Sequence, residues 1–206
     1  LLLVEGIDLK SSLVKAKQKK EIVTLLVEAG AEYTLHEAVT MKDIDVVERC
    51  LKKVGIKVNQ VDENGRTPLI AAIENNYIEI VKRLLLVEGI DLKSSLVKAK
   101  QKKEIVTLLL DAGAECTLHE AVTLNDIDVV ERCLKKDGIK INQVNENGRT
   151  PLIAAIENNC IDIVKRLLLV KGIDLNRVDE TGKTSLYLAC ESGQTNIVQC
   201  LLLLED

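Results

Sequence analysis

The sequence predicts an all-α protein in which short helix-turn-helix units stack on one another. Three observations predict it. Residues 84–166 repeat residues 1–83 almost verbatim, and a third copy begins at Leu167 and diverges after Leu175. Apolar residues recur at helical spacing, and turn-forming residues separate the helical stretches. Self-similarity at a fixed period is typical of architectures in which each unit buries its apolar face against a neighbour.

The most complete unit runs from Val61 to Gly89. It opens with the turn-forming tetrapeptide Asp-Glu-Asn-Gly at 62–65. Thr67 then has the residue type of an N-cap, and Pro68 suits the first helical position. The apolar residues 69–73 therefore predict a short first helix.

The second half of this unit predicts a tight corner and a second helix. Asn75 and Asn76 favour a helix C-cap, because asparagine accepts left-handed backbone. Gly89 ends the second helix. Its apolar stripe has helical spacing and comprises Ile80, Val81, Leu84 and Leu85.

These residues resemble a known family. The pattern D-x-x-G-x-T-P-L-x-x-A, followed by I-V-x-x-L-L and a glycine, is similar to the ankyrin repeat, a β-turn and two helices in about 33 residues. Ile70 stands where the family usually has histidine. A second copy over Val144–Gly172 carries the same TPLI, and a third over Val178–Leu204 reads TSLY and ACESG. The resemblance implies an ankyrin-like α-solenoid.

We expect one solenoid over residues 1–206, with about seven helix-turn-helix repeats after an incomplete helix at 1–5. Some units have short connections. This predicts that the β-hairpin segments, which we call fingers, remain only before the third, sixth and seventh units, at 61–66, 144–149 and 178–183. Because Leu1–Gly6 match the end of a second helix, we expect the chain to be a fragment. The predicted units lie near 11–32, 33–59, 60–92, 93–115, 116–142, 143–175 and 176–206.

The composition argues against several classes of protein. Charged residues make up 29% of the chain and the net charge is −4, so no basic face for nucleic acid is expected. No apolar run approaches the roughly 18 residues of a membrane span. No C-x-x-C occurs, so we expect reduced thiols and an intracellular, cytoplasmic location. The six cysteines are Cys50, Cys116, Cys133, Cys160, Cys190 and Cys200.

Two histidines stand in an incomplete zinc-binding motif. His36-Glu37 and His119-Glu120 begin like a zinc-protease helix, but the second histidine at i+4 is replaced by Thr40 and Thr123. The resemblance to ankyrin repeats implies that this histidine has a structural role and connects neighbouring turns. Because the finger of its own unit is short, we expect the histidine to lack that partner.

Two further motifs are incomplete. Gly182-Lys183-Thr184 ends like a phosphate-binding loop, but Arg177 stands where the first glycine is required. The segment 62–65 lacks the full spacing of a calcium loop. No catalytic residue, cofactor or metal is therefore expected, and the chain is predicted not to be an enzyme.

Two lysine runs remain open to interpretation. They fit either a solvated helix face or a surface for an acidic patch on a partner. The absence of interleaved aromatic residues makes them a poor platform for single-stranded nucleic acid. The runs are Lys10, Lys15, Lys17, Lys19 and Lys20, and Lys93, Lys98, Lys100, Lys102 and Lys103.

The sequence predicts a non-enzymatic module that binds another protein through finger tips and the concave face of its inner helices. Arg66 and Arg149 are the preferred anchors, since arginine is enriched among interface hot spots. Alternatives are a spacer or scaffold that self-associates through Leu1–Leu3 and Leu201–Leu204, or a targeting arm of a larger enzyme or channel. The resemblance implies these partner-binding residues: Glu63, Asn64, Arg66, Glu74, Asn75, Glu146, Asn147, Arg149, Glu157, Asn158, Glu180, Thr181, Lys183, Glu191 and Ser192.

Overall fold

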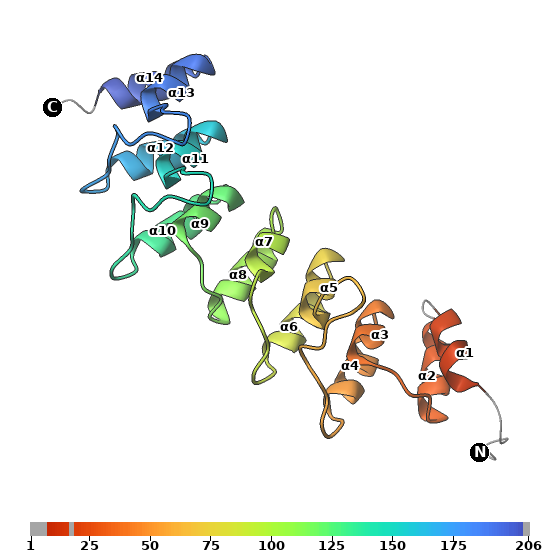
Figure 1. Ribbon diagram of the computed structural model, residues 1–206. Coiled ribbons are helices and arrows are strands. Elements are labelled where there is room, and N and C mark those ends of the chain that lie inside the picture. The colour runs from red at the N-terminus through yellow and green to blue at the C-terminus, as the bar shows by residue number, and fades with distance from the viewer. Residues whose placement is uncertain (1–7, 17–18, 204–206) are drawn as a thin grey trace. The chain divides into compact units, whose positions relative to one another are not determined.

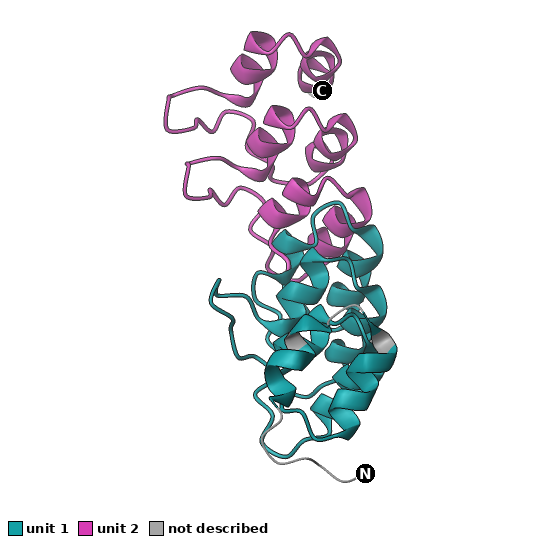
Figure 2. Cartoon of the chain, turned by 90° about the vertical axis from the view of Figure 1, so that its right-hand side faces the viewer, with its two compact units in different colours: residues 1–115 teal, residues 116–206 magenta. Residues whose placement is uncertain are grey.

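The computed structural model of the chain describes residues 8–16 and 19–203, and its described part is helical without strands. The incomplete helix expected at 1–5 lies outside the described residues. The chain divides into two compact units, residues 1–115 and 116–206 (Figure 2). The predicted single array and its unit boundaries stay predictions.

The first unit consists of four helical hairpins in chain order (Figure 1). The odd-numbered helices α3, α5 and α7 pack in one row, and the even-numbered α4, α6 and α8 pack in a second row. The helices are α1 (Leu9–Lys15), α2 (Lys20–Glu28), α3 (Leu35–Thr40), α4 (Ile44–Leu51), α5 (Pro68–Glu74), α6 (Ile78–Leu85), α7 (Ser95–Lys98) and α8 (Lys103–Asp111).

The second unit repeats this arrangement. Helix α11 packs against both α9 and α13, and α12 packs against both α10 and α14. We call the odd-numbered row the inner helices and the even-numbered row the outer helices. The helices are α9 (Leu118–Leu124), α10 (Ile127–Leu134), α11 (Pro151–Glu157), α12 (Ile161–Leu168), α13 (Ser185–Glu191) and α14 (Thr195–Leu202).

Threonine caps begin the inner helices α3, α5, α9, α11 and α13. The Thr67 Oγ1 accepts a hydrogen bond from the Ile70 N–H at 3.2 Å, and Pro68 follows in the first turn. Thr34 forms a capping box. Its hydroxyl oxygen accepts a hydrogen bond from the Glu37 N–H, and the Glu37 carboxylate accepts one from the Thr34 N–H. These caps satisfy N–H groups that have no partner inside the helix. The predicted helix start at Thr67-Pro68 is confirmed.

Left-handed residues make the corners between inner and outer helices. Asn76 follows α5 with φ 57° and Asn159 follows α11 with φ 53°. Asparagine tolerates this region better than other residues with a Cβ atom. The corner predicted at Asn75-Asn76 is therefore present.

The core is a layer of aliphatic side chains between the two helix rows. The side chains of Ile73 and Leu84 are fully buried, as are Ile156 and Leu167 at the same positions of the second unit. Short helices suit this layer, because each pair buries one apolar stripe against the next. The helices predicted for the short first and fourth predicted units are confirmed as α1, α2, α7 and α8.

Long connections carry the fingers. No helix covers 52–67, 135–150 or 169–184, whereas only 29–34 and 112–117 separate α2 from α3 and α8 from α9. The predicted hairpins are turns in the described residues and have no strand pairing. The Asp62 N–H donates to the Arg66 carbonyl at 2.9 Å to close the first finger.

Asparagine side chains join a long connection to the connection that follows the next helix pair. The Asn59 Nδ2 donates to the Gly89 carbonyl at 2.7 Å, and its Oδ1 accepts from the Asp91 N–H at 2.8 Å. Asn142 makes the same two bonds to Gly172 and Asp174, at 2.7 and 2.9 Å. Each asparagine thus joins two connections that are about thirty residues apart in sequence.

We expect Asn142→Ala to lower the free energy of unfolding by about 1 kcal/mol, because it removes two hydrogen bonds to the backbone of the next connection. Urea denaturation followed by circular dichroism measures the change. Gln143→Ala is the control, since Gln143 is exposed beside it. Equal stabilities of the two variants would contradict the role given to Asn142.

Candidate protein-binding surface

Each finger tip is fixed by one Asx side chain. The Asp62 Oδ1 accepts from the Asn64 and Arg66 N–H groups, both at 2.9 Å. Asn145 does the same at 3.0 and 3.1 Å, and Asp179 at 2.8 and 3.0 Å. A side chain that caps its own turn holds the following tip residues in place before any partner arrives.

A salt bridge joins each finger to the inner helix that follows it. The Arg66 guanidinium lies 3.3 Å from the Glu74 carboxylate. Arg149 lies 2.6 Å from Glu157, and Lys183 lies 2.7 Å from Glu191. An exposed pair contributes little stability, so its main effect is to orient the finger on the helix. Arg66 and Arg149, the preferred anchors, are thus already paired within the chain.

The first finger has the strongest electrostatic coupling. The Arg66 side chain also binds the Asp62 carboxylate, with Nη2–Oδ2 at 2.7 Å. This hydrogen bond, with the backbone N–H of Arg66, lowers the pKa of Asp62 to about 2. In turn, the Asp62 carboxylate raises the pKa of Arg66. The hydroxyl of Thr181 and the N–H of Lys183 lower the pKa of Asp179 in the last finger.

The two histidines bind the finger of the next repeat. The His36 Nε2 lies 2.9 Å from the Gln60 carbonyl oxygen, and the His119 Nε2 lies 2.8 Å from the Arg149 carbonyl oxygen. The expectation that this histidine lacks a partner is therefore wrong. The hydrogen-bond acceptor belongs to the finger of the following repeat and not to the histidine's own repeat.

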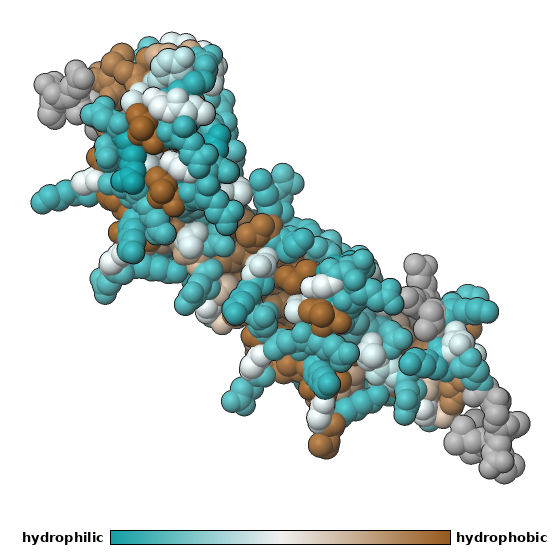
Figure 3. Space-filling model, in the orientation of Figure 1, coloured by the Kyte–Doolittle hydropathy of each residue, from teal (hydrophilic) through white to brown (hydrophobic). Residues whose placement is uncertain are grey.

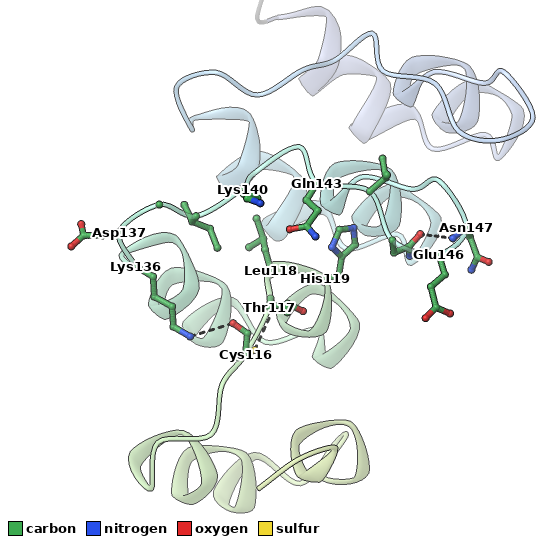
Figure 4. Close-up of a pocket in the computed structure, with 14 residues that line it drawn as sticks. Cys116, Thr117, Leu118, His119, Lys136, Asp137, Lys140, Gln143, Glu146 and Asn147 are labelled. Carbon is green, nitrogen blue, oxygen red and sulfur yellow. Dashed lines mark hydrogen bonds between the residues drawn. The ribbon is translucent and has the colours of Figure 1, made fainter.

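A hollow lies between each of these histidines and the finger it binds. The hollow of the first unit has a volume of about 850 Å³ and that of the second about 710 Å³. In the second unit His119 and Gln143 face the hollow, and Glu146 and Asn147 form the finger at its edge (Figure 4). Such a volume accommodates several side chains of a bound protein.

Two fingers touch in the second unit. A Cβ atom added at Gly148 would lie 2.7 Å from the Glu180 Cγ and 3.2 Å from the Glu180 N. Gly148 also has φ +66°, where a side chain is strained. The tips at 145–149 and 179–183 therefore form one continuous surface.

Within each finger repeat, the predicted site residues lie on the finger tip and at the end of the inner helix that follows it. In each finger repeat, the tip residues and the residues at the end of the inner helix are exposed, while the cation between them is partly covered. The Asn75 Nδ2 donates to the Ala71 carbonyl at 2.8 Å. Sequence reasoning missed Asp62, Asn145 and Asp179 as organisers of the tips, although their shared spacing to the glycine of each turn could have revealed them.

Three further predictions concern the lysine run, a membrane span and a metal site. Lys98 lies 3.4 Å from Glu74, and the Lys102 Nζ donates to the carbonyls of Ile73 and Glu74 at 2.8 and 3.1 Å. This part of the lysine run therefore caps α5 rather than only facing solvent. No helix of the described residues has the length and apolar character to span a membrane. The residues described also contain no group of three potential metal ligands.

The leucine-rich ends are only partly described. Leu1–Leu3 and Leu204 lie outside the described residues, whereas Leu201 is buried and Leu202 and Leu203 are 52% and 81% exposed. Hydrophilic side chains cover most of the visible face of each unit, with hydrophobic patches between them (Figure 3).

Comparison with known families identifies the fold. The family model for ankyrin repeats, which contains three copies, matches residues 11–96, 35–118 and 118–206. The chain therefore belongs to the ankyrin repeat family, whose domains generally mediate protein–protein interaction. A sequence search of curated proteins gave no significant match.

Solved structures agree with this assignment. The ankyrin repeat protein EF0377 is 30% identical, with a TM-score of 0.70 over 82% of this chain and 96% of that chain. The ankyrin repeat domain ABAYE2397 from Acinetobacter baumannii AYE is 27% identical, with a TM-score of 0.67 over 82% and 96%. A chain in the complex of the Bd0816 predatory endopeptidase from Bdellovibrio bacteriovorus with immunity protein Bd3460 is 25% identical, with a TM-score of 0.69 over 84% and 98%.

We expect Gly148→Ala to destabilise the protein more than Gly65→Ala. Both changes place a side chain at positive φ, which costs about 1–2 kcal/mol. Only Gly148 also meets the next finger, because nothing lies within 4 Å of a Cβ atom at Gly65. Equilibrium urea unfolding of the two variants measures the difference, and equal losses would show that the fingers do not touch in solution.

The low pKa of Asp62 has a stability consequence. Since the folded-state pKa is about 2 and the usual value is about 4, the stabilisation is fully present above about pH 4 and is lost as the pH falls through about 2. We expect Arg66→Gln to raise the pKa of Asp62 towards its usual value. An NMR titration of the carboxyl groups measures it.

Asp179 is the internal control for that titration, because Thr181 and Lys183 lower its pKa and Arg66 does not contribute. If the pKa of Asp62 stayed near 2 in Arg66→Gln, the backbone donors alone would explain it.

Proposed function

We propose that this chain is a non-enzymatic module that binds another protein through its finger tips and the neighbouring ends of the inner helices. The observation that carries the proposal is the tie between each finger and its inner helix, seen in Arg66–Glu74, Arg149–Glu157 and Lys183–Glu191. It recurs at the same spacing in three repeats. A surface held in this way loses little conformational entropy when a partner binds.

The charges on the tips indicate what kind of partner fits. Each finger cation is matched by a glutamate of the same repeat, so it contributes little net charge outward. Glu63, Glu146 and Glu180 remain exposed at equivalent tip positions. The tips therefore favour a partner surface that is basic or rich in hydrogen-bond donors.

The hollows beside the tips add a second kind of contact. Each is bounded by exposed polar residues of the finger and by the aliphatic side chain of Val61 or Val144. Two lysines also line each hollow, Lys53 and Lys57 in the first unit and Lys136 and Lys140 in the second, so an apolar partner side chain matches the hollow better than a cationic one. The chain thus offers anchoring space beside an acidic tip.

A photocrosslinking experiment tests the proposal. A photoreactive amino acid replaces Asn64 or Asn147 at the tips, or Lys165 on outer helix α12 as the control. In cells that make the protein, we expect the two tip positions to crosslink the same partner and the α12 position to give no such adduct. Crosslinking from α12 alone would contradict a finger-tip interface.

Charge reversal then tests the partner's chemistry. We expect Glu63→Arg with Glu146→Arg to slow association with the captured partner by about tenfold or more at low salt. Glu88→Arg with Asp162→Arg changes the net charge equally at exposed positions away from the tips, and should leave the rate unchanged. Surface plasmon resonance at two salt concentrations measures both. Equal effects of the two pairs would count against acidic tips as the contact.

Self-association is a second candidate, favoured by the last helix pair. Leu186 and Tyr187 of α13 are 37% and 53% exposed, whereas Leu152 and Ile153 at the same positions of α11 are fully buried. Sedimentation velocity of the chain separates the two candidates. A concentration-dependent dimer that Tyr187→Glu abolishes would support end-to-end association.

A further inference from the structure

Two buried cysteines meet where the second unit begins its first hairpin. Cys116 directly precedes Thr117, the N-cap of α9, and Cys133 lies in the last turn of α10. Helices α9 and α10 pack against each other. The two cysteines are 5% and 1% exposed.

The two sulfur atoms share one backbone acceptor, the Thr117 carbonyl oxygen. The Cys133 Sγ lies 3.4 Å from the Cys116 carbonyl oxygen and 3.8 Å from the Thr117 carbonyl oxygen. The Cys116 Sγ lies 3.4 Å from that same Thr117 oxygen. Two sulfurs in contact with one oxygen atom lie close to each other. Cys116 also belongs to the non-helical segment 112–117, which can adjust more easily than a helix.

A small molecule can reach Cys116 through the hollow of the second unit. Cys116 lines that hollow together with Lys136 (Figure 4). The Lys136 ammonium lies 3.2 Å from the Cys116 carbonyl oxygen, which places a positive charge beside both sulfurs. A nearby cation favours the thiolate, the form of cysteine that reacts.

We propose that Cys116 and Cys133 form an oxidant-sensitive thiol pair, which a peroxide converts into an intramolecular disulfide. This modification site is independent of the finger-tip function. It makes the second unit, and not the first, responsive to oxidation.

The chemistry balances with one peroxide molecule. One sulfur attacks a peroxide oxygen and the O–O bond breaks, which gives a sulfenic acid and one water molecule. The second sulfur then attacks the sulfenic sulfur, the S–S bond forms and a second water molecule leaves. Two thiols lose two electrons and two protons, and hydrogen peroxide is reduced to two water molecules.

The pair titrates as a unit. The hydrogen bond with Cys133, followed by burial, raises the pKa of the Cys116 thiol. The hydrogen bond from Cys116 lowers the pKa of Cys133, and the charge of Lys136 acts in the same direction. Because the two thiols are coupled, the loss of the first proton belongs to the pair and not to one sulfur.

The duplication supplies an internal control. Tyr33 and Cys50 of the first unit occupy the positions of Cys116 and Cys133. There the Lys53 ammonium lies 3.8 Å from the Tyr33 ring centroid. A tyrosine at this position is compatible with the fold, but it cannot form a disulfide with Cys50.

The test exposes the reduced chain to hydrogen peroxide. The chain carries Cys190→Ser, because Cys190 is exposed and would form disulfides between molecules. After denaturation and alkylation, we expect two fewer alkylated thiols, and a non-reduced digest should contain one crosslinked peptide pair joining Cys116 to Cys133. A reductant should restore both thiols, and Cys50 should stay alkylated throughout.

Cys116→Tyr is the matched variant, since it installs the residue of the first unit. It should keep the circular-dichroism melting curve of a folded protein and form no crosslink to Cys133. If its melting shows that it does not fold, Cys116→Ala serves the same purpose. The proposal is overturned if Cys116 and Cys133 both remain alkylated in the parent chain, or if Cys50 is lost at the same rate.

Discussion

Within each unit, the covering of one inner helix by the next helix pair is the constraint on which the remaining structure depends. Ile153 in α11 is fully buried because α13 packs over it, whereas Tyr187 at the same position of α13 is 53% exposed. The helices are too short to be stable alone. Their stability is therefore a property of neighbouring pairs, as in other repeat proteins whose units contact mainly their immediate neighbours. The polar tips and the hollows are built on this apolar stack.

Hydrogen bonds and ion pairs hold the fingers in fixed positions on the helical stack. Asn59 and Asn142 each join a long connection to the connection after the next helix pair, and the two histidines bind the base of the following finger. Farther out, an Asx turn shapes the tip and an ion pair sets its angle to the inner helix. Lys102 and Gln194 donate to the Ile73 and Ile156 carbonyls at the ends of two inner helices. Each tie joins residues whose distance is already fixed by the helices, so little entropy is lost in forming it.

Local chemistry explains why the helices could be predicted from the sequence. The threonine caps, the Pro68 start and the asparagine corner act within a few residues, so their effect is readable without the fold. The histidine contact could not be read in the same way, because Gln60 and Arg149 lie 24 and 30 residues farther along the chain. Arg66 and Arg149 were expected to face a partner. Their pairing with glutamates depends on how the finger folds back over the inner helix, which no local pattern specifies.

The base and the tip of the first finger are held by groups that respond differently to acid. A carbonyl oxygen only accepts hydrogen bonds, so the Nε2 of His36 and His119 must carry a hydrogen, as it can in both the neutral and the protonated imidazole. Acidification therefore leaves this bond chemically possible, while it removes the carboxylate that holds the tip at Asp62. Near pH 2, where Asp62 takes up a proton, the base of the first finger would keep its histidine contact while its tip loosens, so the finger would hinge at that contact.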